Sequence, residues 1–181
     1  MRRRIIEAQD SDIVCLCETH LTEGQGIEVD GYFWYGHSRQ TLHRAAPKGS
    51  GGVGLLIKTK LLKDYSIRIV DRSVEGVIGV ALEHKVSGFN MLVFGCDLPP
   101  ENSPWGRDAV SFYAHLLSQT YIYDDADCII FCGDLNGRIG SLNDSINGLD
   151  TLPSRECVDK CVNQHGKALI DFLHESRFCV L

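Results

Sequence analysis

Short apolar runs recur along the first half of the chain, and turn-forming or charged residues separate them. Runs of this kind, bounded by Gly, Pro, Asn or Asp, are typical of β-strands. The predicted strands are residues 13–17, 32–35, 53–58, 65–70, 77–82, 91–95 and 128–133. Because 13–17 and 128–133 are apolar almost throughout, we expect both to be covered on two faces and 13–17 to lie centrally in a sheet.

A helical period replaces the strand pattern after residue 100. Residues 108–121 predict a helix with Val110, Tyr113, Leu117 and Tyr121 on its core face. The pattern then returns to the apolar run 128–133, so this helix is expected to cross over between two strands.

Three further segments complete the pattern. A helix is expected from about residue 166 to residue 176, with Asn163 as its cap. Its expected core stripe consists of Leu169, Phe172 and Leu173. Residues 2–9 are compatible with a helix, and residues 178–181 resemble the beginning of a strand.

The order of these elements predicts the fold class. Strands that dominate the first half, followed by alternating helices and strands, favour an α/β (α+β) sandwich of two sheets covered by helices. The length of 181 residues favours a single domain over residues 1–181. We see no internal repeat and no linker.

Composition and charge narrow the function. The chain is 44% hydrophobic, which predicts a packed core, and its net charge of -6 argues against a general nucleic-acid coat protein. An enzyme that carries metal-binding carboxylates can still be acidic. We recognise neither a signal peptide nor a long apolar span, so we expect an intracellular protein that does not contact a membrane, with the nucleus as a candidate location.

Eight cysteines occur, and most of them lie inside apolar runs. Without a leader sequence, we interpret them as reduced, largely buried thiols. Cys157, Cys161 and His165 have a spacing that can place three zinc ligands on one helical face. A fourth ligand is missing, which disfavours zinc.

Three predicted strands end at acidic side chains: Glu18, Asp97, and Asp134 with Asn136. In an extended chain Asp134 and Asn136 point the same way, and the three strand ends can meet at one sheet edge. Carboxylates suit Mg²⁺ or Mn²⁺, which take one or two of them plus water and phosphate. Asp and Asn beside Gly also form turns, and a lone Glu is commonly a surface residue. The residues alone therefore indicate a candidate metal-assisted phosphoryl site.

A polar loop at residues 39–52 carries several cations. Arg39, Arg44 and Lys48 are candidates for phosphate contacts, together with Asp97 as a possible substrate-binding residue. A solvated loop is the alternative explanation of such a charge run.

Three segments resemble the endonuclease/exonuclease/phosphatase superfamily, which has the DNase I-like fold. They are residues 12–21 (Asp-Ile-Val-Cys-Leu-Cys-Glu-Thr-His-Leu), 50–57 (Ser-Gly-Gly-Val-Gly-Leu-Leu-Ile) and 133–140 (Gly-Asp-Leu-Asn-Gly-Arg-Ile-Gly). They occur in the family's order, and the resemblance covers essentially the whole chain. It implies a four-layer sandwich, two sheets flanked by helices.

Within that superfamily, the chain is most similar to the endonuclease domains of animal non-LTR retrotransposons, relatives of apurinic/apyrimidinic endonucleases. Residues 98–108 (Leu-Pro-Pro-Glu-Asn-Ser-Pro-Trp-Gly-Arg-Asp) resemble retroelement proteins in particular. The resemblance implies DNA as substrate, Mg²⁺ (or Mn²⁺) as cofactor, and a longer parent protein with a reverse transcriptase region.

The resemblance also assigns roles to individual residues. Glu18 matches the family's metal-binding glutamate. Asp134 matches an aspartate near the scissile phosphate, which orients the nucleophile or protonates the leaving oxygen. Asn136 matches an asparagine that hydrogen-bonds the phosphate. The implied reaction is hydrolysis of a DNA phosphodiester by water, which leaves a nick.

The sequence also departs from the family pattern. We find no match to the metal-site asparagine that ends the family's first strand, and none to its Ser-Asp-His segment, so we expect an incomplete domain. His20 lacks the Ser-Asp partners and is interpreted as a loop or supporting residue. Asp97 stands where the family has a tyrosine.

Loss of an acid–base group costs about 10²–10⁴-fold in rate, and loss of an electrostatic donor about 10²–10³-fold. We therefore expect a weak or inactive endonuclease. Two alternatives remain open: a non-catalytic remnant or binding module on the same scaffold, and a phosphatase acting on a phosphoinositide or sphingolipid headgroup.

Overall fold

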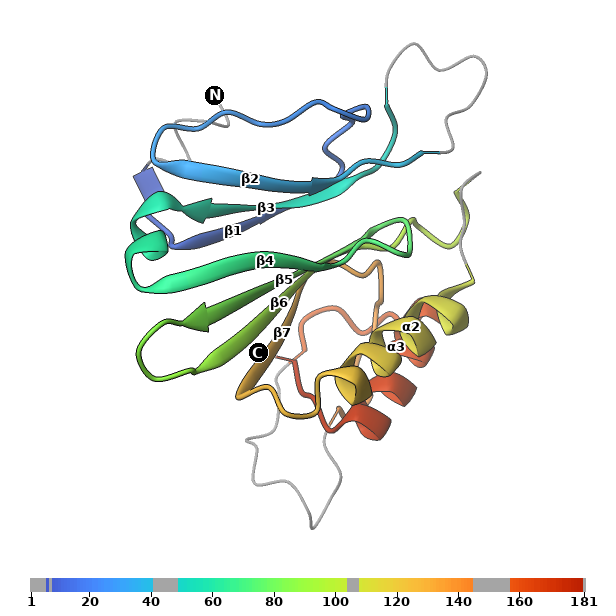
Figure 1. The fold of residues 1–181 in the computed structure, drawn as a ribbon. Coiled ribbons are helices and arrows are strands. Elements are labelled where there is room, and N and C mark those ends of the chain that lie inside the picture. Colours follow the sequence, from blue (N-terminus) through green and yellow to red (C-terminus); the bar gives the residue numbers. More distant parts are fainter. Residues whose placement is uncertain (1–5, 7, 41–48, 104–107, 145–156, 181) are drawn as a thin grey trace. The chain divides into compact units, whose positions relative to one another are not determined.

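The computed structural model describes the chain apart from residues 1–5, 7, 41–48, 104–107, 145–156 and 181 (Figure 1). The chain divides into two compact units. The first, here called the strand unit, comprises residues 1–97 and 125–134. The second, the helix unit, comprises residues 98–124 and 135–181. Each unit is described by itself.

The strand unit consists of two sheets packed face to face (Figure 1). The first sheet is antiparallel, in the order β1-β3-β2, and contains β1 (Ile13–Leu16), β2 (Tyr32–His37) and β3 (Val53–Lys58). The second has the order β4-β5-β6-β7 and contains β4 (Tyr65–Asp71), β5 (Val77–His84), β6 (Asn90–Asp97) and β7 (Cys128–Asp134). A 3₁₀ turn, η1 (Thr59–Lys63), links the sheets. All seven predicted strands are confirmed.

Alternate residues of the strands fill the space between the sheets. The fully or almost fully buried members are Val53, Leu55, Ile57, Ile78, Val80, Leu82 and Val93. A second cluster covers the outer face of the first sheet, where Leu56 packs with Val29 and with Ile6. Ile6, Ala8 and Gln9 are helical, in agreement with the predicted N-terminal helix. Residues 53–57 of β3 are buried, in agreement with a strand whose two faces are both covered.

The positions of two strands differ from expectation. Among the strands that the structure describes, β1 lies at an edge of its sheet and β3 occupies the centre. β7 is likewise an edge strand among the described residues, and Ile130 is 40% exposed, so the expected burial on both faces is wrong for β7. An apolar run is typical of a strand whose two faces are covered, but β7 shows that such a run can also occur where one face is partly exposed. It carries no information about the number of hydrogen-bonded neighbours beside the strand.

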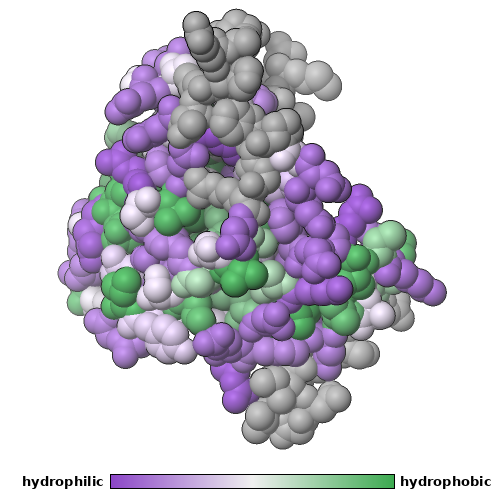
Figure 2. Space-filling model, turned by 90° about the vertical axis from the view of Figure 1, so that its right-hand side faces the viewer, coloured by the Kyte–Doolittle hydropathy of each residue, from purple (hydrophilic) through white to green (hydrophobic). Residues whose placement is uncertain are grey.

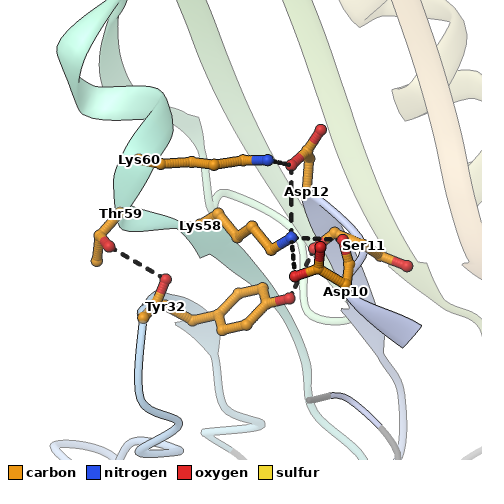
Figure 3. A network of polar contacts seen from close by, with 8 residues as sticks. Asp10, Ser11, Asp12, Tyr32, Lys58, Thr59 and Lys60 are labelled. Atoms are coloured by element: carbon orange, nitrogen blue, oxygen red, sulfur yellow. Dashed lines mark hydrogen bonds and ion pairs between the residues drawn. The ribbon is translucent and has the colours of Figure 1, made fainter. Parts of the chain in front are cut away.

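A network of charges joins the beginning of β1 to the end of β3 (Figure 3). The Lys58 side chain is only 9% exposed, and its Nζ lies 2.5 Å from Asp10 Oδ1 and 3.7 Å from Asp12 Oδ1. Lys60 pairs with Asp12 at 2.7 Å. The Tyr32 hydroxyl donates to the Ser11 carbonyl at 2.7 Å. We call this group the Lys58 cluster.

The helix unit contains α2 (Ala109–Ile122) and α3 (Gln164–Ser176), which pack against each other. The rings of Tyr113 and Phe172 stack at 5.7 Å between centroids. The Asn163 side chain accepts a hydrogen bond from the Gly166 N–H at 2.7 Å, so the predicted cap is confirmed. Leu169, Phe172 and Leu173 are buried as predicted.

The predicted core face of α2 is confirmed at Tyr113 and wrong at Val110 and Tyr121, while Leu117 is half-buried. Val110 is 68% exposed and Tyr121 is 64% exposed. The buried positions are Ala109, Phe112, Tyr113, Leu116 and Gln119. Because apolar residues occur on more than one face of this helix, the period of the sequence did not define the packed face.

The expected strand at the C-terminus does not form among the described residues 178–180. Phe178 instead packs against Phe172, with ring centroids 6.3 Å apart. No helix of the described chain is long and apolar enough to cross a membrane. On the face drawn in Figure 2, hydrophobic residues lie interspersed among hydrophilic ones.

Candidate active site

Three acidic residues gather at one end of the strand unit. Asp97 and Asp134 are the last residues of β6 and β7, and they are direct partners in the parallel register of these strands. Glu18 follows β1, and its backbone N–H donates a hydrogen bond to the Asp97 carboxylate. The structure therefore brings together the acidic ends of three strands, as the sequence predicts.

Asp97 is the most enclosed member of this carboxylate cluster, at 2% exposure. Burial raises the pKa of Asp97 to about 6, and the negative charges of Glu18 and Asp134 act in the same direction. The Glu18 N–H and the Arg39 guanidinium oppose the rise. Among the described residues, Asp97 Oδ2 has no hydrogen-bond partner although it is buried. A buried carboxylate oxygen without a partner is energetically costly.

Gly133 allows β7 to deliver Asp134 to this cluster. Its φ of 128° lies in a region that side chains rarely adopt, and an added Cβ would overlap the Cys96 carbonyl oxygen. The Asp134 N–H donates to Cys17 Sγ at 3.3 Å, and the Cys17 thiol donates to the Cys96 carbonyl at 3.2 Å. Cys17 thus connects the ends of β1, β6 and β7.

The segment after β1 is fixed by the glycines that precede β3. The N–H groups of Thr19 and His20 donate to the carbonyls of Gly52 and Gly51 at 3.1 Å and 2.8 Å. Gly52 has a φ of 91°, and a Cβ there would meet the Thr19 hydroxyl. The Ser-Gly-Gly segment therefore holds the backbone that carries Glu18.

Glu18 and His20 both have left-handed backbone conformations, with φ of 52° and 56°. Such conformations are uncommon for non-glycine residues and are concentrated at functional sites. His20 Nε2 lies 3.5 Å from Glu18 Oε2, and both side chains are 53% exposed. His20 Nδ1 lies 3.2 Å from the Gly49 carbonyl oxygen. This agrees with the interpretation of His20 as a loop or supporting residue.

Arg39, predicted as a candidate for phosphate contacts, is buried, so the alternative explanation of a solvated side chain does not apply to it. It is 8% exposed, its Nε lies 3.9 Å from Glu75 Oε2, and its guanidinium lies close to Gly51. Its charge lowers the pKa of Asp97. Arg39 therefore acts as an internal countercharge for the carboxylate cluster. Arg44 and Lys48 lie outside the described residues.

Asn136 belongs to the helix unit, and its surroundings there are well defined. Its Nδ2 donates to the Leu98 carbonyl at 2.7 Å, and its own carbonyl accepts from Asn163 Nδ2 at 2.8 Å. The φ of Asn136 is 46°, so the chain leaves the extended conformation directly after β7. The extended geometry expected for Asp134 and Asn136 is therefore wrong.

The carboxylate cluster has donors that suit a divalent cation. Its three side chains supply hard oxygen atoms, and Asp97 Oδ2 is a buried oxygen without a protein partner. The described residues contain no group of three His, Cys, Asp or Glu placed to hold one metal ion. A pair of carboxylates, completed by water and phosphate, remains the arrangement that fits Mg²⁺.

Two supporting residues of the site were missed at the level of the sequence. Cys17 appeared only as a buried thiol, and Gly133 only as the end of a strand. The clue to Gly133 was its position directly before Asp134. Cys157 and Cys161 precede α3, while His165 lies within it, so these three residues do not share one helical face.

A comparison of the sequence with models of known families identifies the family of the chain. The chain belongs to the Endonuclease/Exonuclease/phosphatase family, whose sequence model matches residues 3–171. This membership confirms the resemblance to the DNase I-like superfamily.

Among curated proteins, an exodeoxyribonuclease from Bacillus subtilis (strain 168) is 28% identical over 137 residues. The alignment covers 72% of this chain and 49% of that protein. Among solved structures, the AP endonuclease LMAP from Leishmania major superposes with a TM-score of 0.64 at 16% identity. That match covers 96% of this chain and 60% of the other. The likeness confirms the predicted α/β fold with two sheets and helices, and the chain spans about half to three fifths of the length of these relatives.

Proposed function

We propose that this chain is the nuclease domain of a divalent-metal-dependent DNA endonuclease, which hydrolyses one phosphodiester of a duplex and leaves a nick. The observation that carries the proposal is the convergence of Glu18, Asp97 and Asp134 at the ends of β1, β6 and β7. The similarity to an exodeoxyribonuclease supports DNA as the substrate. We further propose a parent protein of the non-LTR retrotransposon type, with a reverse transcriptase region elsewhere.

Glu18 is the proposed metal ligand, with Mg²⁺ or Mn²⁺ as the ion. When bound, the cation offsets negative charge on the phosphate oxygens. Glu18 suits this role because its side chain is half-exposed, while its backbone is fixed by the Ser-Gly-Gly segment. The carboxylate is therefore accessible to substrate and yet held in one place.

Asp134 is proposed to act on the water or on the leaving oxygen. Its side chain is exposed at the end of β7, and its N–H is held by Cys17. An exposed carboxylate on a fixed backbone can accept a proton from an attacking water or orient that water. Asn136 is the proposed amide donor to the phosphate. Its Nδ2 donates to the Leu98 carbonyl at 2.7 Å, which fixes the orientation of the amide group.

We propose that activity of these 181 residues alone is weak. They contain no match to the Ser-Asp-His segment of the family, and loss of one acid–base group costs about 10²–10⁴-fold in rate. A long assay with high enzyme concentration is therefore the appropriate test.

The experiment is nicking of supercoiled plasmid with Mg²⁺, with Mn²⁺ and with chelator. We expect slow nicking that requires the cation and falls at least about 100-fold in Asp134→Ala and Glu18→Ala. Asp64→Ala and Glu83→Ala serve as matched controls, because both residues are exposed and lie outside the carboxylate cluster.

Metal-dependent nicking that survives Asp134→Ala would exclude the proposed site. Absence of nicking from a chain that unfolds cooperatively would instead favour a non-catalytic binding module. Phosphate release from a phosphoinositide without nicking would identify the third candidate function.

A further inference from the structure

Asp97 differs from the other acids of the carboxylate cluster in how it is enclosed. It is 2% exposed, and its Oδ2 has no hydrogen-bond partner among the described residues. Glu18 and Asp134 are exposed and can be solvated by water. A buried carboxylate oxygen needs a partner that the protein does not supply.

The position of Asp97 beside Glu18 limits what that partner can be. The Glu18 N–H donates to the Asp97 carboxylate, so the two residues lie next to each other. The negative charge of Glu18 raises the pKa of Asp97 more than the negative charge of Asp134 does. A second anion is disfavoured by this charge, while a small cation is attracted.

Arg39, the nearby cation of the protein, does not supply the partner that Asp97 Oδ2 lacks. Arg39 lowers the pKa of Asp97 through its charge, but its Nε lies 3.9 Å from Glu75, another carboxylate. The charges of Glu18, Asp97, Asp134 and Glu75 therefore exceed the positive charge of Arg39.

We propose that Asp97 is a second carboxylate ligand of the divalent cation, which Oδ2 binds together with the Glu18 side chain. This inference rests on the proposed function and specifies its metal site. Two carboxylates plus water and a substrate phosphate form the coordination that Mg²⁺ commonly adopts in proteins. The proposed function assigns Asp134 to the water, so the proposed coordination shell contains only Glu18 and Asp97 from the protein. This agrees with the described residues, among which no three acidic side chains are placed around one ion.

This arrangement explains why a carboxylate is tolerated where a phosphate must approach. An ionised Asp97 alone would repel the substrate. With the cation bound, the charge of Asp97 is neutralised, and Oδ2 gains the partner that it lacks. Substrate binding should therefore depend on the cation more strongly than in a site with one carboxylate.

The test is calorimetric titration of the full chain with Mn²⁺ above pH 7, without substrate. Four variants are compared: Glu18→Gln, Asp97→Asn, Asp134→Asn and the exposed control Asp64→Asn. We expect Glu18→Gln and Asp97→Asn each to weaken Mn²⁺ binding at least about tenfold, since even residues that only support metal ligands cost 10–100-fold when changed. Asp134→Asn, which removes an exposed charge of the same cluster, should cost about fivefold or less.

The control for folding is the unfolding transition of each variant, and Asp97→Ser replaces Asp97→Asn if the latter does not fold. One outcome would overturn the role of Asp97 and leave the proposed function intact. In that outcome Glu18→Gln loses Mn²⁺ affinity, while Asp97→Asn binds Mn²⁺ at least as tightly as Asp134→Asn does. Tight binding that needs both residues, without any nicking, would support the metal site and contradict the proposed function. Absence of Mn²⁺ binding in the unmodified chain would overturn both.

Discussion

The two ends of β1 carry similar residues in different electrostatic conditions. At its beginning, Asp10 and Asp12 lie against Lys58 and Lys60, so two carboxylates meet two ammonium groups (Figure 3). At its end, Glu18 lies with Asp97 and Asp134, and the nearby Arg39 is shared with Glu75. The first group is balanced within the protein, whereas the second carries an excess of negative charge.

The difference separates a structural cluster from a candidate binding site. In the Lys58 cluster every charge has a partner, and the pKa of Lys58 is raised by its hydrogen bond with Asp10. Such a group joins two strands and attracts no ligand. In the carboxylate cluster, burial and like charges raise the pKa of Asp97, and Oδ2 stays without a partner. Perturbation of this kind is concentrated at functional sites.

The largest effect on stability is expected from Gly133→Ala, because this substitution disturbs the backbone that positions Asp134 in the carboxylate cluster. The new Cβ would overlap the Cys96 carbonyl in a backbone conformation that alanine rarely adopts. We expect a loss of about 3 kcal/mol or more in the free energy of unfolding, measured with denaturant. Gly88→Ala is the matched control: its φ is 72° and no atom lies within 4 Å, so only about 1 kcal/mol should be lost. Equal effects would show that the close approach at Gly133 is unimportant.

The pH dependence of stability should have opposite signs at the two ends of β1. The pKa of Asp97 is raised to about 6, so the folded state binds its proton more tightly than the unfolded state does. In metal-free buffer this contribution is present at about pH 4 and is lost as the pH rises through about 6. The difference in unfolding free energy between wild type and Asp97→Asn should therefore change by about 2–3 kcal/mol between these limits, in favour of Asp97→Asn at neutral pH.

Asp10 provides the opposite case. Its hydrogen bond with Lys58 lowers its pKa, so its contribution is present at neutral pH and is lost as the pH falls through the folded-state value. Asp10→Asn should be less stable than wild type at neutral pH and equally stable in acid. Denaturant unfolding of both variants at several pH values measures the two slopes. If the unfolding free energies of Asp97→Asn and Asp10→Asn, relative to wild type, changed with pH in the same direction, the proposed electrostatic difference between the two clusters would be wrong.

A smaller effect is expected from Lys58→Met, which keeps the length of a side chain that is 9% exposed and removes its charge. Asp10 and Asp12 would lose their shared partner, so the midpoint of thermal unfolding should fall. Lys60→Met, at a 58% exposed position, should shift the midpoint by no more than about a degree. Neither variant should alter Mn²⁺ affinity. A change in that affinity would show that the two ends of β1 are coupled.

The smallest effect is expected from His20→Gln, because His20 and Glu18 form an exposed pair at 3.5 Å. The loss of unfolding free energy should be below about 0.5 kcal/mol, and Mn²⁺ affinity should change by less than about twofold. Unfolding and titration calorimetry measure both. A tenfold loss of Mn²⁺ affinity would contradict the interpretation of His20 as a supporting residue and would indicate that it takes part in metal binding.

The strands, the cap of α3 and the acidic strand ends were predictable from the sequence, because consecutive residues encode them. The run at 53–58 corresponds to β3, and Asn163 lies directly before α3. The core face of α2 was not predictable, since Val110 and Leu116 are equally apolar and only packing distinguishes them. The position of β1 at an edge of the described sheet was not predictable either. Its apolar sequence indicates covered faces and does not show how many strands lie beside it.

The acids Glu18, Asp97 and Asp134 and the family of the chain could be identified without any coordinates. The environments of these acids depend on the folded chain. Cys17 holds the backbone of Asp134 across 117 positions of the chain, and Glu18 donates to Asp97 from a different sheet. Burial, countercharge and the partnerless Oδ2 depend on neighbours that are distant in sequence. Local composition therefore identifies the acids, and the fold determines which of them requires a cation.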